Sequence, residues 1–190
     1  MSSPTKDKLL SATVDYVAVN GIGELSLRHL ATALGTSHRM LIYYFGSRQG
    51  LLVEVVRAVE ERQREALAQL DSEPGTTPDE VARRLWRQLA DPALWPNERL
   101  FFELYAQALQ GSPHAVPLLD GIVENWLGPA TEMAMRRGLT ADVARAEARL
   151  GIAVTRGLLL DLLATGDRDG VDQAMERFIA ISLTATGQDS

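Results

Sequence analysis

The segment from Ser26 to Phe45 constrains the fold most, because it reads as two short helices joined by a tight turn. Ser26 and Ser37 stand where helix N-caps are needed, and Gly35 stands where the turn needs a positive φ. In the first of the two helices, apolar residues recur at helical spacing and predict one buried stripe: Leu27, Leu30, Ala31 and Leu34. The pattern predicts a helix-turn-helix motif.

The second helix of this motif directs polar and aromatic side chains away from its buried side. Arg39 is able to donate two hydrogen bonds to a guanine edge, whereas Arg28 and Arg48 suit phosphates. Tyr44 is alternatively a core residue, and Arg28 and Arg39 are alternatively ordinary solvated charges. The side chains predicted to contact DNA are Arg28, Thr36, Ser37, His38, Arg39, Tyr43, Tyr44 and Arg48.

The residues around this motif resemble the signature of the tetracycline-repressor (TetR) family of bacterial regulators. The similarity covers roughly Leu9 to Leu52 and includes the Tyr44-Phe45 pair, the Gly46-Ser47-Arg48 turn and Leu51-Leu52. Ile42 departs from the pattern, because the family usually has a tyrosine there that contacts phosphate. The resemblance implies a homodimer on palindromic double-stranded operator DNA, usually a repressor that a small molecule releases.

In the rest of the chain apolar residues recur mostly at helical spacing, and no alternating pattern typical of β-strands is present. We expect an all-α fold of about nine helices, with a three-helix DNA-binding domain at 1–50 (motif 26–45) and a helical ligand-binding and dimerisation domain at 51–190. Gly and Pro residues separate most of the helices. The expected helices cover 4–20, 27–34, 38–44, 48–70, 78–90, 96–110, 115–137, 140–164 and 171–186.

The last two expected helices, about 140–164 and 171–186, are apolar on more than one side. A second apolar stripe predicts a second partner, and the family resemblance implies a four-helix interface between two subunits. The alternative is that both helices lie in the centre of a monomeric bundle. Arg156 and Asp161 interrupt the first of these helices, and the sequence leaves open whether they face a pocket or the partner.

Bulky residues in the second domain are candidates for binding an unidentified small-molecule effector, although most such residues simply form core. The candidates are Trp86, Phe102, Tyr105, Trp126, Met133 and Arg156. We expect no cofactor and no metal, because the chain has no cysteine, only three histidines and no recognisable catalytic motif. An enzyme is therefore not expected. The competing interpretation is a helical ligand-binding or enzymatic domain whose N-terminal hairpin does not bind DNA.

The charge distribution agrees with a DNA-facing end. Net charge is −6, but residues 1–57 carry +2 and the remainder carries −8. Residues Met1 to Lys8 are polar and no apolar signal-peptide core follows them. The most apolar stretch, 150–163, is too short and too charged to span a bilayer. We therefore expect a cytoplasmic protein without a membrane segment.

Overall fold

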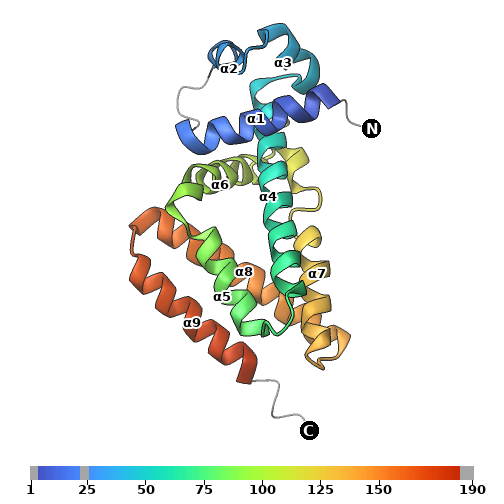
Figure 1. Ribbon diagram of the computed structural model, residues 1–190, viewed down its shortest axis with the longest axis vertical. Coiled ribbons are helices and arrows are strands. Elements are labelled where there is room, and N and C mark those ends of the chain that lie inside the picture. Colours follow the sequence, from blue (N-terminus) through green and yellow to red (C-terminus); the bar gives the residue numbers. More distant parts are fainter. Residues whose placement is uncertain (1–3, 22–25, 185–190) are drawn as a thin grey trace. The chain divides into compact units, whose positions relative to one another are not determined.

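The computed structural model describes residues 4–21 and 26–184, and this part of the chain is helical without a strand. The all-α fold class is confirmed. Within these residues the chain forms nine α-helices, labelled in Figure 1, and two short 3-10 helices: α1 (Pro4–Asn20), α2 (Leu27–Ala33), α3 (His38–Phe45), α4 (Arg48–Ser72), α5 (Pro78–Leu89), η1 (Pro92–Leu94), α6 (Trp95–Leu109), η2 (Val116–Leu119), α7 (Glu124–Arg136), α8 (Ala141–Thr165) and α9 (Arg168–Thr184).

The prediction of a single helix over 115–137 was wrong. The segment divides into η2 and α7, with Gly121 at φ +74° between them. Pro117 lacks the N–H that a continuing helix needs, and the positive φ of Gly121 breaks the helical path. The last helix begins at Arg168 rather than at residue 171, because Asp167 Oδ1 accepts a hydrogen bond from the Gly170 N–H at 2.9 Å. Its expected end at 185–186 lies outside the described residues.

Backbone contacts divide the chain into two compact units. One comprises Met1–Arg62 with Pro92–Asp120, and the other comprises Gln63–Asp91 with Gly121–Ser190. α6 therefore belongs to the same unit as the helix-turn-helix segment, although α5 precedes it in the sequence. The expected boundary at residue 50 separates the predicted DNA-binding domain from the predicted ligand-binding and dimerisation domain, and it stays a prediction.

In the first unit, buried side chains come from α1, α2, α3 and the beginning of α4. Those without appreciable exposure include Val17, Leu30, Leu41, Leu51 and Val55. α6 packs against α1 and against both 3-10 helices, and its Leu100 and Leu104 are buried. These contacts place α6 directly beneath the first helix of the predicted DNA-binding domain (Figure 1).

In the second unit, α8 packs against both α7 and α9, and α5 also packs against α9. A closed set of hydrogen bonds joins α5 to α9. The indole Nε1 of buried Trp86 donates to Asp172 Oδ1 at 2.6 Å. Arg168 donates to Asp172 Oδ2 at 2.8 Å and to the Ala90 carbonyl at 2.9 Å. Arg168 thus donates a hydrogen bond to the backbone carbonyl of the residue that follows α5.

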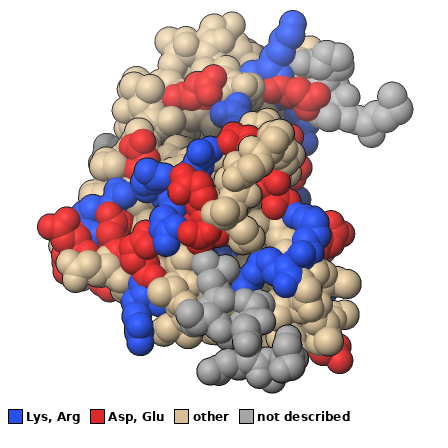
Figure 2. Space-filling model, turned by 60° about the horizontal axis from the view of Figure 1, so that its bottom comes forward, with Lys and Arg blue, Asp and Glu red and all other residues tan. Residues whose placement is uncertain are grey.

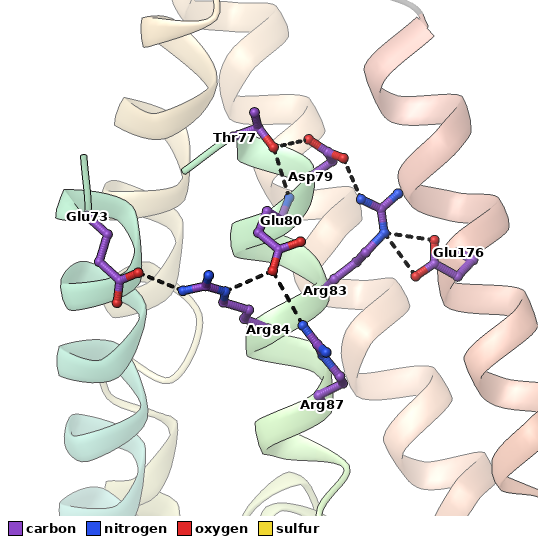
Figure 3. Close-up of polar contacts among 8 residues, drawn as sticks. All are labelled: Glu73, Thr77, Asp79, Glu80, Arg83, Arg84, Arg87 and Glu176. Atoms are coloured by element: carbon purple, nitrogen blue, oxygen red, sulfur yellow. Dashed lines mark hydrogen bonds and ion pairs between the residues drawn. The ribbon is translucent and has the colours of Figure 1, made fainter. Parts of the chain in front are cut away.

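An ion-pair network covers the exposed side of α5 (Figure 3). Arg83 bridges Asp79 of α5 and Glu176 of α9, and Arg84 bridges Glu80 of α5 and Glu73. Hydrogen bonds from the Thr77 hydroxyl and from Arg83 lower the pKa of Asp79. The face shown in Figure 2 carries basic and acidic groups side by side, without a patch of one sign.

None of the helices in the described ranges is long and apolar enough to serve as a membrane span.

Candidate functional site

The turn between α2 and α3 is built from local hydrogen bonds. Ser26 Oγ accepts from the His29 N–H, and Ser37 Oγ accepts from the Met40 N–H, each at 3.2 Å. Both serines therefore cap the helices as predicted. Gly35 has φ +63°, and the next residue donates its N–H to the Ala31 carbonyl at 2.9 Å. The turn fixes α3 against α2 through backbone geometry rather than through long side chains.

α3 has two sides of opposite character. Leu41 and Phe45 are buried, at 0% and 8% exposure. His38 and Arg39 are exposed, and Tyr43 is 76% exposed. An eight-residue helix with two buried anchors presents its opposite side chains to solvent at fixed positions. This is the geometry that a helix entering the major groove requires.

The junction between α3 and α4 holds the end of α3 tightly. Gly46 adopts φ +72°, and Ser47 Oγ accepts a hydrogen bond from the Gly50 N–H at 3.0 Å. An added Cβ on Gly50 would lie 2.3 Å from the Phe45 carbonyl oxygen. Lys6 of α1 lies 5.6 Å from the centre of the Phe45 ring and pairs with Glu54 of α4. These contacts join α1, α3 and α4 at the end of α3.

The residues predicted to contact DNA differ in how far they reach solvent. Arg28, Ser37, His38, Arg39 and Tyr43 are exposed. The other three, Thr36, Tyr44 and Arg48, are half-buried.

Tyr44 packs edge-on against Tyr43 and Phe45, with ring centres 5.0 and 6.4 Å apart. Its half-buried ring therefore contacts one exposed and one buried aromatic side chain. Ile42 is 38% exposed and lies at the edge of the outward side.

The sequence around this site matches a known family. Residues 9–55 fit the model described as "Bacterial regulatory proteins, tetR family". The "HTH-type transcriptional regulator BetI" of Pseudomonas aeruginosa is 28% identical over 177 residues, which cover 90% of this chain and 87% of the relative. The chain belongs to the tetR family of bacterial regulatory proteins. It is a DNA-binding transcriptional regulator, and the prediction of a regulator rather than an enzyme is confirmed.

Solved structures share the fold of this regulator. A transcriptional regulator from Rhodococcus sp. Rha1 superposes with a TM-score of 0.73 at 20% identity, and the match covers 97% of each chain. A regulator from Saccharomonospora viridis, solved in complex with choline, gives a TM-score of 0.66 at 20% identity over 94% of this chain and 97% of that chain. Both likenesses extend through the helices that follow the matched N-terminal segment.

The residues predicted to bind an effector fall into the two compact units of the regulator. In the first unit, Phe102 and Tyr105 are half-buried on α6, and both lie near Phe101. The Phe101 ring centre is 5.1 Å from that of Phe102 and 5.5 Å from that of Tyr105. These three rings form one aromatic group along α6.

In the second unit, the candidates have different surroundings. Trp126 and Met133 belong to an apolar cluster with Leu67, Val81 and Ile152. Trp86 directs its indole N–H to Asp172, so that donor is engaged inside the protein. Arg156 donates to the Ile122 carbonyl at 2.6 Å. Asp161, by contrast, is exposed.

Sequence reasoning missed two buried polar side chains in the first turn of α6. Asn97 is 5% exposed and Glu98 is 6% exposed. Polar residues that follow a proline at a helix start usually serve as exposed helix-end groups, so their type and position predict nothing unusual. The observation that sets Asn97 apart is its Oδ1 atom, which is buried and accepts no hydrogen bond from the described residues.

Proposed function

We propose that the regulator is a homodimeric repressor whose two α3 helices read successive major grooves of a palindromic operator, about 34–36 Å apart. The two-sided character of α3 carries this proposal. Buried Leu41 and Phe45 hold the helix, while exposed Arg39 and its outward neighbours are available to base edges and phosphates. Arg28 and Arg48, on α2 and α4, supply flanking phosphate contacts. The regulator would act in the cytoplasm, where bacterial operators are found.

The surface of α8 supports a dimer. Val143, Leu150 and Leu160 are 52%, 54% and 51% exposed. Together with small exposed residues they follow a regular three-four spacing over the length of the helix: Val143, Ala146, Leu150, Ala153, Gly157, Leu160 and Ala164. On the adjacent α9, Ala174 and Ile181 are also exposed.

A stripe with this spacing suits knob-into-hole packing against a second helix, and the small residues permit close approach. We propose that a second copy of the chain packs against this stripe, because a palindromic operator needs two DNA-binding helices related by a two-fold axis. α8 and α9 of each subunit would form a four-helix interface.

The effector would bind among the aromatic and polar side chains of the helices after α4, with Trp86, Phe102, Tyr105, Trp126, Met133 and Arg156 as candidate contacts. α6 packs against α1, so a ligand that changes the position of α6 acts on a direct neighbour of the reading helices. Binding would favour the state that no longer fits the operator, by as much as the ligand prefers that state. The choline-bound structure of the Saccharomonospora viridis regulator makes choline the first compound to test.

The decisive experiment is footprinting of the full-length regulator on DNA upstream of its own gene. The expected result is a short protected palindrome whose affinity falls steeply as salt rises, because the Lys and Arg contacts release counterions. Addition of the effector should then remove the protection. Protection that is indifferent to salt, or absent from every tested operator, would support the competing ligand-binding domain without a DNA-reading role.

A further inference from the structure

Ile42 is an apolar residue on the outward side of α3. At about 100° per residue, it lies one turn after His38 and Arg39 and between them around the helix axis. All three side chains are exposed, and 38% of the Ile42 surface is accessible. This aliphatic side chain therefore belongs to the same surface as two polar side chains that are predicted to contact DNA.

The backbone of α3 holds Ile42 at a fixed place. The Ile42 carbonyl accepts a hydrogen bond from the Gly46 N–H at 2.8 Å, and the preceding residue, Leu41, is fully buried. Isoleucine branches at Cβ, so one χ1 rotamer strongly predominates in a helix. The methyl groups of Ile42 therefore point in a nearly constant direction, as a contact with one defined base position requires.

The chemistry of isoleucine restricts what Ile42 is able to recognise. Single exposed apolar residues are common on protein surfaces, but Ile42 stands between two polar side chains on the side of α3 that the proposed function directs at base edges. Its side chain has no hydrogen-bond donor or acceptor, so it bonds neither to a phosphate nor to the polar edge of a base. The apolar group that the bases present in the major groove is the C5-methyl group of thymine.

We infer that Ile42 is a specificity-determining residue that recognises thymine through van der Waals contact with the C5-methyl group. The inference rests on the proposed function, because it requires α3 to enter the major groove. It adds to the site a residue that contacts DNA through apolar surface alone. Arg39 then selects its base by hydrogen bonds, whereas Ile42 selects thymine by the methyl group.

The test compares thymine with uracil, because these two bases differ only in the C5-methyl group. The full-length regulator first selects a duplex from a pool of random DNA. Each thymine of that duplex is then replaced by deoxyuridine, and affinities are measured by fluorescence anisotropy at one salt concentration. Replacement at one position of a half-site should weaken binding about fourfold, the value of one buried methyl group, and roughly 15-fold when both half-sites are changed.

Two substitutions of Ile42 assign the thymine contact to this side chain. Ile42→Ala should bind the thymine duplex more weakly than the wild type and should no longer distinguish thymine from uracil at that position. Ile42→Val keeps the branch at Cβ and should retain most of the discrimination. Both variants should melt within a few degrees of the wild type, because the replaced side chain is exposed.

Two control variants separate Ile42 from its surroundings. Leu109→Ala removes another aliphatic side chain, which is 68% exposed at the end of α6, and should leave the affinities for both duplexes unchanged. Tyr43→Ala removes the exposed neighbour of Ile42 on the outward side of α3. It should lower the affinities for the thymine and uracil duplexes by the same factor.

Three results would overturn the inference. The first is a wild-type regulator whose affinity for the selected duplex is unchanged by every replacement of thymine with uracil. The second is an Ile42→Ala variant that weakens binding to the thymine and uracil duplexes equally. The third is a discrimination that Tyr43→Ala removes and Ile42→Ala retains.

Failure of the inference and failure of the proposed function give different results. If the selected DNA is palindromic but no thymine methyl group affects binding, the two-fold reading of the operator stands and the role of Ile42 fails. If a single copy binds a site without a palindrome and Ile42→Ala removes the thymine preference, the role of Ile42 stands and the homodimer fails. If the selection yields no preferred DNA, both fail.

Discussion

Gly50 lies so close to Phe45 that a Cβ atom on the glycine would stand 2.3 Å from the Phe45 carbonyl oxygen. A backbone atom cannot be displaced as cheaply as a flexible side chain, so Gly50→Ala must shift either α4 or the end of α3. We expect it to lower the free energy of unfolding by about 1–3 kcal/mol, the range for overpacked sites. Thermal and urea denaturation followed by circular dichroism would measure the loss.

Gly128→Ala is the control for this substitution. Gly128 lies within α7, and a Cβ there would meet no atom within 4 Å. Alanine should therefore stabilise that helix by roughly 0.5–1 kcal/mol. Equal effects at the two glycines would show that the short Gly50–Phe45 approach does not constrain the α3–α4 junction.

Arg39 and Arg28 should affect operator binding in different ways. Arg39→Ala is expected to cost about 1–3 kcal/mol on the cognate site and to relax one base preference, because Arg39 lies on the outward side of α3. Arg28→Ala should weaken binding on all sequences and reduce the salt slope by about one. Binding to a library of single-base operator variants would distinguish the two patterns. A uniform loss for Arg39→Ala would reassign this residue to a phosphate.

The hydrogen bond from Trp86 to Asp172 should stabilise the second unit. Trp86→Phe removes the indole donor while keeping most of the apolar surface, and is expected to cost about 0.5–1.5 kcal/mol because the half-buried Asp172 carboxylate loses one of its partners. The measurement is urea denaturation of Trp86→Phe, Asp172→Ala and the double variant. Additive losses in this cycle would mean that the two side chains are not coupled in solution.

An added charge on the exposed stripe of α8 should prevent dimer formation. Leu160→Arg would bury an unpaired guanidinium in the proposed interface and should weaken self-association at least about 100-fold. Light scattering after size-exclusion chromatography would report the mass, and operator affinity should fall in parallel. Gln69→Arg, at an exposed position of α4, is the charge-matched control. A Leu160→Arg variant that remains dimeric would place the interface elsewhere.

Asp79 should give stability that depends on pH. Its pKa is lowered below the ordinary value of 3.8 by the Thr77 hydroxyl and by Arg83. A lowered pKa in the folded state contributes stability above the unfolded value, and this contribution is lost as pH falls through the folded value.

Asp79→Asn should therefore be less stable than the wild type at pH 7, by no more than about 1 kcal/mol for a partly exposed ion pair. The difference should shrink below about pH 4. Thermal melts across this range would test it, with Asp142→Asn in the first turn of α8 as the control. A difference that does not change with pH would exclude the ionised carboxylate as its source.

The sequence predicted the parts of the fold that depend on local chemistry. The helix caps depend on the side chains of Ser26 and Ser37, and the turn depends on the φ value of Gly35. The motif and its outward side could therefore be predicted from the sequence. The break at Gly121 was missed because apolar residues continue on both sides of it. The buried state of Asn97 was missed for a different reason, since burial depends on which distant helices pack against α6.

The separation of α3 into buried and exposed side chains has a consequence for how the target sequences of such regulators change. Leu41 and Phe45 hold the helix in place, whereas the side chains at 38, 39 and 43 contribute little to the core because they are exposed. Substitutions at these three positions can therefore accumulate without a penalty in folding. A duplicated copy of this gene could acquire a new target sequence through a few changes on one side of an eight-residue helix, while the rest of the molecule stays as it is.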